Sequence, residues 1–275
     1  MSLYEEVTNR ILAQLEQGIA PWVKPWAVPP PYNAATQHRY SGVNVLLLWD
    51  TPYKRPAWLT YRQARTLGGQ VKRGERATPI VYASTIKKHQ EDEEKVIPFL
   101  RRYFVFNVDQ VDGLPTNLYA PASLPAGQQV GTFFSAVPAD VRHGGSRAYY
   151  HPVLDYIQVP DPEHFASPER YCATRLHETV HWSGHPSRLH RHFGERFGDQ
   201  SYAFEELIAE IGSAYLSADL GLQAELHHAE YIGHWVTLLR DHRRAIFTAA
   251  AKATAAAEYL KGLAGLAPPV GAQAQ

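Results

Sequence analysis

The run His177-Glu178-Thr179-Val180-His181 combines residue types and a spacing that suit metal-dependent hydrolysis. At about 3.6 residues per turn, a helix would place His177 and His181 on one face, where two imidazoles can bind one metal ion. Glu178 would lie beside that face and could reach a metal-activated water without being a ligand. This spacing is typical of zinc metallopeptidases, in which the glutamate acts as general base. A site of two histidines, one carboxylate and an open position favours Zn²⁺ as the cofactor.

The third ligand must come from another part of the chain. In one class of zinc peptidases a histidine follows in the pattern HExxHxxGxxH, but Ser187 occupies that position here. Residues 201–216 form a predicted helix in which Glu206 and Glu210 share one face, whereas Glu205 is turned roughly 100° away. We expect Glu206 to be the metal ligand and Glu210 to orient a ligand histidine, with Glu205 as the alternative ligand. The competing interpretation is a solvated acidic helix face.

Other polar side chains near these segments could stabilise a transition state. The sequence does not choose among four candidates, which are Tyr202, Tyr215, His185 and His192.

The flanks of the histidine motif predict the helix that must hold it. Ser167 is a typical N-cap, Pro168 suits the first helical position, and Glu169 complements the positive end of the helix dipole. No helix breaker follows before Gly184, a common type of helix stop. The motif is therefore predicted to lie inside a helix of about four turns.

The remaining hydrophobic pattern predicts an α+β chain. Proline, alanine and glycine are frequent over 114–130, which indicates a domain boundary between residues 1–122 and 123–275. Helices are expected at 3–18, 42–48, 60–67, 133–141 and within 226–263, and strands at 79–84, 100–108, 148–150 and 156–159, with a charged hairpin tip at 87–95.

The N-terminal half is basic, although the whole chain has 27 Lys and Arg against 27 Asp and Glu. Residues 1–120 contain 15 basic against 11 acidic side chains, and the remainder contains 12 against 16. Cations interleaved with aromatic rings suit single-stranded nucleic acid, because cations follow the phosphates while bases stack on the rings. For single tryptophans, burial in the core is the competing explanation. The candidate contacts are Tyr40, Lys54, Arg55, Trp58, Tyr61, Arg62, Arg65, Lys72, Arg73 and Arg76.

Several features indicate a cytoplasmic protein without a membrane partner. No apolar run approaches the roughly 18 residues that span a bilayer, and MSLYEEVTNR has no apolar signal core. The single cysteine, Cys172, excludes an internal disulfide framework and suits a reducing compartment. The sequence does not predict an oligomeric state.

These motifs together resemble one family. HETVHWSGHPSRLHR and YAFEELIAEIGSAYL are similar to the metallopeptidase half of ArdC-type antirestriction proteins from conjugative plasmids and mobile elements. APWVKPW, YSGVNVLLLW, WLTYRQARTLGGQVKRGE and YFVFNVDQV resemble the single-stranded-DNA-binding domain of that family. The resemblance extends from about Tyr4 to Leu260. It implies a small α+β DNA-binding domain followed by a mostly helical zincin-like metallopeptidase domain with a short sheet.

Three hypotheses about function follow. The first is an antirestriction protein that binds single-stranded DNA non-specifically and carries a zinc peptidase site, with an unidentified protein or peptide substrate. It would protect incoming plasmid DNA in the recipient cell. The second is a protein that coats single-stranded DNA, with a structural or vestigial metal site. The third and weakest is a primase accessory protein.

Overall fold

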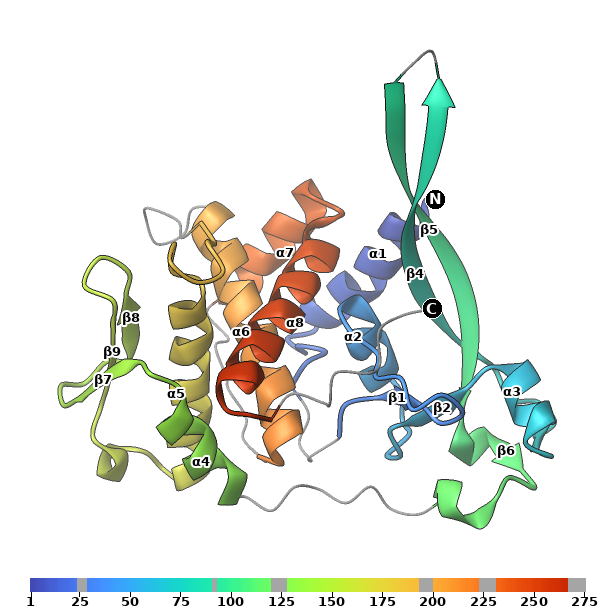
Figure 1. The fold of residues 1–275 in the computed structure, drawn as a ribbon, viewed down its shortest axis with the longest axis horizontal. Coiled ribbons are helices and arrows are strands. Elements are labelled where there is room, and N and C mark those ends of the chain that lie inside the picture. The colour runs from blue at the N-terminus through green and yellow to red at the C-terminus, as the bar shows by residue number, and fades with distance from the viewer. Residues whose placement is uncertain (24–28, 91–92, 120–127, 193–199, 223–230, 267–275) are drawn as a thin grey trace.

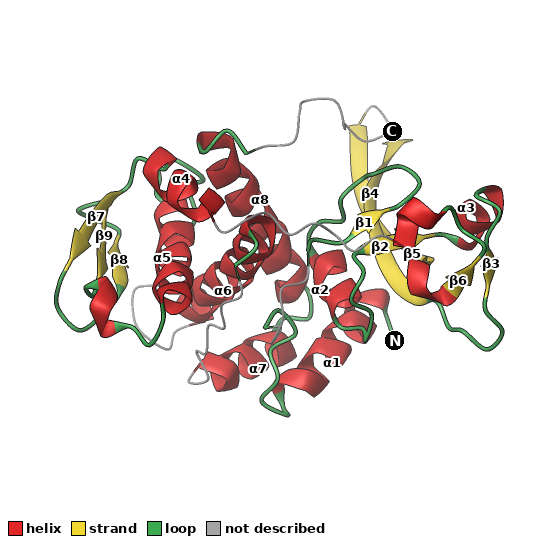
Figure 2. Cartoon of the chain, turned by 90° about the horizontal axis from the view of Figure 1, so that it is seen from below, coloured by secondary structure: helices red, strands yellow, loops and turns green. Residues whose placement is uncertain are grey.

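The computed structural model describes residues 1–23, 29–90, 93–119, 128–192, 200–222 and 231–266. Its described part is α+β, as predicted, with helices at the centre and small sheets toward the two ends (Figures 1 and 2). None of the helices in this part is both long and apolar enough to cross a bilayer.

In the residues that the structure describes, the N-terminal half combines three α-helices with two small sheets. The larger sheet has the order β1-β2-β5-β4, in which β1 is parallel to β2 and the other pairs are antiparallel. A second sheet pairs β3 with β6. The elements are α1 (Leu3–Leu15), β1 (Tyr32–Asn33), α2 (Val43–Trp49), β2 (Ala57–Leu59), α3 (Tyr61–Thr66), β3 (Gln70–Val71), β4 (Thr78–Gln90), β5 (Glu93–Asn107) and β6 (Val111–Asp112), with 3-10 helices at Val108–Gln110 and Thr116–Tyr119.

The β4–β5 hairpin is longer than predicted. Its backbone pairing runs from Thr78–Val105 to Gln90–Glu93, through the segment that was predicted to be a charged tip. In Figure 1 the outer part of the hairpin extends away from the helices. Apolar and polar residues alternate along a strand only where one of its faces packs on a core. The sequence therefore predicted the strands only up to the point where the hairpin leaves the core.

The described part of the C-terminal half is mostly helical, with one three-stranded sheet of order β7-β9-β8. The predicted helix over 133–141 is wrong in its second part, because Pro138 cannot continue a helix and Asp140 begins a strand. The elements are α4 (Gln128–Ala136), β7 (Asp140–His143), β8 (Tyr149–His151), β9 (Tyr156–Val159), α5 (Pro168–Ser183), α6 (Gln200–Leu220), α7 (Ile232–Asp241) and α8 (Ala245–Leu263), with a 3-10 helix at Pro162–His164.

The main hydrophobic core is shared by the two halves of the chain. Leu15 of α1 and Leu46 of α2 belong to the same buried cluster as Leu216 of α6 and Ile246 of α8. Two smaller clusters lie in the N-terminal half. The predicted boundary between residues 122 and 123 falls within 120–127, outside the described residues, so the division into two domains stays a prediction.

Candidate metal centre and nucleic-acid surface

Helix α5 begins and ends where its flanking residues predict. The Ser167 side chain accepts a hydrogen bond from the Arg170 backbone N–H at 3.3 Å, and Pro168 occupies the first helical position. Gly184 follows the last helical residue. His177 and His181 therefore lie on one face, with their ring centroids 4.8 Å apart, and both side chains are buried.

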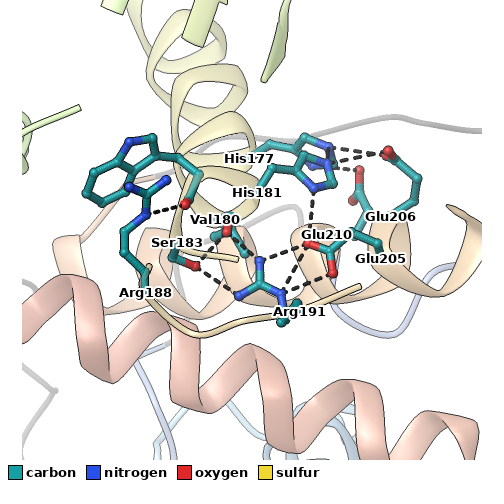
Figure 3. A network of polar contacts seen from close by, with 10 residues as sticks. His177, Val180, His181, Ser183, Arg188, Arg191, Glu205, Glu206 and Glu210 are labelled. Atoms are coloured by element: carbon teal, nitrogen blue, oxygen red, sulfur yellow. Dashed lines mark hydrogen bonds and ion pairs between the residues drawn. The ribbon is translucent and has the colours of Figure 1, made fainter. Parts of the chain in front are cut away.

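Helix α6 packs against α5 and brings Glu206 to the two histidines (Figure 3). The Nε2 atoms of His177 and His181 are 3.1 Å apart. One carboxylate oxygen of Glu206 lies 3.3 Å from His177 Nε2, and the other lies 3.4 Å from His181 Nε2. All three side chains are buried, which excludes the interpretation of a solvated acidic helix face.

The spacing of these donor atoms fits a small divalent ion. A tetrahedral ion with ligand bonds of about 2.0 Å to 2.1 Å has ligand atoms separated by about 3.3 Å. The separation of 3.1 Å between the two imidazole nitrogens is close to that edge length, and each nitrogen lies 3.3 or 3.4 Å from a different oxygen of the Glu206 carboxylate. Two imidazole nitrogens and one carboxylate are also a donor set that Zn²⁺ accepts readily. The three residues can therefore hold a metal ion together.

Charge also favours a cation at this position. Burial alone would lower the pKa of His181, but the carboxylates of Glu206 and Glu205 outweigh it and raise this pKa to about 10. Burial would raise the pKa of Glu206, but the two histidines lower it strongly. A proton on the imidazole thus occupies the place where a metal ion would bind, and metal binding would release it.

Glu205 contacts His181 at the other ring nitrogen, Nδ1. Its Oε1 lies 3.2 Å from His181 Nδ1, and both of its oxygens accept hydrogen bonds from Arg191 (Figure 3). This position is on the opposite side of the ring from Nε2, where the histidines and Glu206 meet. The structure therefore does not support Glu205 as the alternative metal ligand.

Two further predicted residues lie in the same buried region. Glu210 has one oxygen 3.6 Å from His177 Nδ1, which places its carboxylate beside the histidine that we expected it to orient. Glu178 is next to His177 on α5 and is only 7% exposed, so its carboxylate is largely removed from bulk water.

Tyr202 is the transition-state candidate whose hydroxyl interacts with the metal-site residue Glu206. It is one turn before Glu206 on α6, and its hydroxyl is 3.2 Å from that of Tyr231. Burial raises the pKa of Tyr202, and its contacts with Tyr231 and Glu206 raise it further. Tyr215 instead donates to the backbone oxygen of Gly42 and packs on Trp49.

The two histidine candidates are solvent-facing or locally paired. His185 lies 2.7 Å from the Ser187 hydroxyl, and the His192 side chain is exposed. Of the residues near the site, the sequence did not indicate Tyr231 or Arg191, because only folding brings them to α6.

Burial corrects the predicted DNA contacts. Trp58 is 1% exposed and packs with Leu48 and Val105, so the prediction that it stacks on bases is wrong for this structure. Tyr40 is half-buried beside the same cluster. Both rings are buried or half-buried for the same reason, because an aromatic side chain on or beside a central strand packs into the core.

Two of the predicted cations contact Asp109. Arg55 forms an ion pair with Asp109 and donates to the Tyr119 backbone oxygen at 2.8 Å. Lys72 donates to the Asp109 backbone oxygen at 2.8 Å. The other predicted side chains are exposed, namely Lys54, Tyr61, Arg62, Arg65, Arg73 and Arg76.

Exposed aromatic residues also occur on the β4–β5 hairpin. Tyr82, Tyr103 and Phe104 are 53%, 44% and 52% exposed. Phe104 and Phe106 are two residues apart on β5 and therefore share one face of the strand. The Phe106 ring lies 6.4 Å from that of Tyr61 on α3. The sequence prediction did not include Phe104 because apolar residues in a strand are usually read as core.

Comparison with known proteins identifies the family. Residues 1–106 match the N-terminal domain of anti-restriction factor ArdC, and residues 128–252 match the zincin-like metallopeptidase family. The metal-free crystal structure of antirestriction protein ArdC from plasmid R388 is 43% identical, with a TM-score of 0.85, over 98% of this chain and 100% of that one. The chain belongs to the ArdC family of antirestriction proteins.

The Mn(II)-bound crystal structure of R388 ArdC is also similar, at 42% identity and a TM-score of 0.82, over 96% of this chain and 98% of that one. A zincin-like domain in an ArdC family member implies that it binds a divalent metal ion. The predictions of the family and of the fold are thus confirmed.

Relatives outside the solved structures differ in length. The uncharacterized protein y4eC of Sinorhizobium fredii is 38% identical over 94% of this chain and 91% of its own length. DNA primase TraC of Escherichia coli is 39% identical over 91% of this chain, but the chain spans only 26% of TraC. A match to about a quarter of TraC does not assign primase activity to this ArdC family member.

Proposed function

We propose that the chain is a zinc-dependent peptidase that also binds single-stranded DNA, and that it protects incoming plasmid DNA in the cytoplasm of the recipient cell. The observation that carries the proposal is the buried group of His177, His181 and Glu206. The two imidazole Nε2 atoms lie 3.1 Å apart, and each lies 3.3 or 3.4 Å from one oxygen of the Glu206 carboxylate. A buried group of this kind suits metal-dependent hydrolysis, whereas a solvated cluster on the surface would not.

The side chains around the metal position have complementary roles in the proposed reaction. A divalent ion at His177, His181 and Glu206 would lower the pKa of water and polarise a peptide carbonyl. Glu178 accepts a proton from the attacking water and returns it to the leaving amine. Tyr202 is the candidate donor of a hydrogen bond to the carbonyl oxygen as it gains negative charge.

Zinc is the proposed ion because of the donor set. Imidazole and carboxylate ligands bind Zn²⁺ more tightly than Mn²⁺, as the general order of divalent metal affinities requires. Elemental analysis of protein purified without added metal, followed by competition between Zn²⁺ and Mn²⁺, tests this directly. Protein that binds neither ion stoichiometrically would contradict the peptidase proposal.

The test of the catalytic role is Glu178→Gln, which keeps the shape of the side chain but removes the base. Peptide hydrolysis should fall by about 10²- to 10⁴-fold, while metal and DNA binding remain. Glu163→Gln, at an exposed glutamate that precedes α5, is the matched control and should retain activity.

The same variant separates proteolysis from DNA coating. Plasmid transfer into a restricting recipient should fail with Glu178→Gln if peptide hydrolysis protects the DNA. A Glu178→Gln protein that protects DNA as well as the parent would favour the DNA-coating hypothesis instead.

We assign single-stranded DNA to the surface formed by α3 and the adjoining part of β5. Tyr61 and Phe104 are exposed there, with Phe106 between them, and Arg62 and Arg65 are exposed on α3. Exposed rings beside cations can stack bases while the cations follow the phosphates. Such contacts read no sequence, so binding would be non-specific and would weaken with salt.

Tyr61→Ala and Phe104→Ala test this surface. Each should weaken binding of a fluorescent single-stranded oligonucleotide by about 1–3 kcal/mol, the usual contribution of one stacked base. Tyr149→Ala removes another exposed ring, from the distant sheet, and serves as the control. If all three variants bind the oligonucleotide as tightly as the parent does, single-stranded DNA does not bind at this surface.

A further inference from the structure

We propose that Arg191 is a positioning residue of the metal site, which acts through Glu205 to set the orientation of His181. The inference rests on the proposed role of His181 as a metal ligand. Figure 3 shows the continuous path from the guanidinium to the carboxylate and on to the imidazole.

The Arg191 guanidinium is buried, and each of its three nitrogens donates a hydrogen bond. Its Nε donates to Glu205 Oε2 at 3.0 Å, and its Nη2 donates to Glu205 Oε1 at 2.8 Å, so the carboxylate is held at both oxygens. Nη2 also donates to the Val180 backbone oxygen at 2.6 Å, and Nη1 donates to the Ser183 hydroxyl at 3.0 Å. Because arginine is planar, these bonds leave the Glu205 carboxylate little freedom to rotate.

The orientation of Glu205 then determines which nitrogen of His181 faces the metal position. Glu205 Oε1 lies 3.2 Å from His181 Nδ1 and can accept its proton in a hydrogen bond. This selects the imidazole form whose Nε2 lone pair points toward His177 and Glu206. A histidine held by a carboxylate in this way binds metal more tightly than one that is free to rotate.

Arg188 provides a natural control for a purely structural role. It comes from the same segment after α5 and also binds the end of that helix, donating from Nε to the Trp182 backbone oxygen at 2.6 Å. Its guanidinium then stacks on the Trp182 ring and donates to Asp155 at 2.9 Å. Both arginines bind the segment after α5 to that helix, but only Arg191 of the two also contacts Glu205, which in turn contacts His181.

The experiment measures Zn²⁺ affinity by competition with a chromophoric chelator, together with thermal unfolding of the metal-free proteins. Arg191→Gln and Glu205→Gln should each weaken Zn²⁺ binding by about 10- to 100-fold. The double variant should lose no more than the larger single effect, because both residues act on one path. Arg191→Lys, which keeps a buried cation, should recover part of the affinity.

Arg188→Gln should lower the unfolding temperature while keeping the Zn²⁺ affinity of the parent. The absorption spectrum of the Co²⁺ form gives an independent readout of ligand geometry, and it should change in Arg191→Gln but not in Arg188→Gln. Activity is not needed for either measurement.

The outcomes distinguish this inference from the proposed function. If the parent binds Zn²⁺ and Arg191→Gln binds it equally well, or if Arg188→Gln weakens binding as much, Arg191 is structural and the inference is overturned. If Arg191→Gln does not fold, the nearly isosteric Glu205→Gln decides, and unchanged affinity in that variant overturns the inference. A parent that binds no Zn²⁺ contradicts the proposed function itself.

Discussion

At the scale of single residues, two adjacent glutamates approach one imidazole from opposite nitrogens. Glu206 lies 3.4 Å from His181 Nε2, and Glu205 lies 3.2 Å from His181 Nδ1. Successive residues on a helix point roughly 100° apart, and this divergence lets neighbouring side chains reach both sides of a ring that packs between them. From the sequence, the same angle indicates only that Glu205 lies on another face than Glu206. The sequence alone therefore allows Glu205 as the alternative metal ligand, because it does not give the position of the histidine ring.

Asp155, outside the metal site, should make the stability of the fold depend on pH. Hydrogen bonds from Arg188 and Tyr150 hold the pKa of Asp155 below its ordinary value of 3.8, although burial acts in the opposite direction. Because the folded pKa is the lower one, this carboxylate stabilises the fold above about pH 4, and the contribution is lost as pH falls through the folded pKa.

Asp155→Asn should therefore destabilise the protein at pH 6 and make a smaller difference at pH 3. Asparagine tolerates the positive φ of 53° at this position, so the substitution removes the charge without adding backbone strain. Urea unfolding at the two pH values checks the prediction. The exposed Asp112→Asn serves as control, and an Asp155→Asn effect that grows toward pH 3 would contradict the assignment.

At the scale of elements, the metal position depends on how closely α5 and α6 approach each other. The two helices lie side by side in Figure 1, and Gly212 of α6 faces Val180 of α5. A Cβ atom at Gly212 would lie 3.0 Å and 3.1 Å from the two methyl carbons of Val180. Val180 is buried and β-branched, so its side chain has little freedom to move away.

Gly212→Ala should push α6 away from α5 and reduce metal affinity. Alanine normally stabilises a helix relative to glycine by about 1 kcal/mol, but overpacking here should cost about 1–3 kcal/mol. Zn²⁺ titration and thermal unfolding measure the two effects. Gly233→Ala on α7, where a Cβ meets no atom within 4 Å, is the control.

A second substitution tests the cause. Val180→Ala in the Gly212→Ala background removes the methyl groups that would collide, and it should restore metal binding. Full metal affinity in Gly212→Ala alone would show that the distance between the helices does not limit the site.

At the scale of the whole molecule, the basic half and the metal-binding half share one core. Helices α1 and α2 lie beside α7 and α8 in Figures 1 and 2, and their apolar residues join one buried cluster. Polar contacts also cross this junction. Asp219 of α6 accepts a hydrogen bond from Arg39 of the N-terminal half at 2.5 Å, and within the C-terminal half it accepts one from the buried Lys261 of α8 at 2.6 Å.

We therefore expect the described halves to unfold in one transition. Far-ultraviolet circular dichroism and tryptophan fluorescence should give coincident curves. Asp219→Ala should lower the unfolding free energy by about 1–3 kcal/mol, because it removes one partner of a buried cation. Glu258→Ala, at a side chain that is 48% exposed, should cost less. Two separate transitions would contradict a shared core.

Local patterns were sufficient for part of the fold and of the site. The α5 helix, its N-cap and the shared face of His177 and His181 could be predicted, because these features depend on residues within a few turns. Pro138 was also visible in the sequence, yet the helix prediction ran past it. The outer hairpin could not be predicted, since its backbone pairing leaves no apolar alternation where the ribbon leaves the core.

The sequence by itself determined the family and the candidate metal-binding residues, namely the His177, Glu178 and His181 spacing and the glutamates of α6. Only the tertiary structure decided how the remaining residues are used. It buried Trp58, left Phe104 exposed, turned Glu205 toward Nδ1 of His181 and brought in Arg191. The physical reason is range, because helical spacing is set by neighbouring residues, whereas burial and side-chain partners depend on which distant segments pack together.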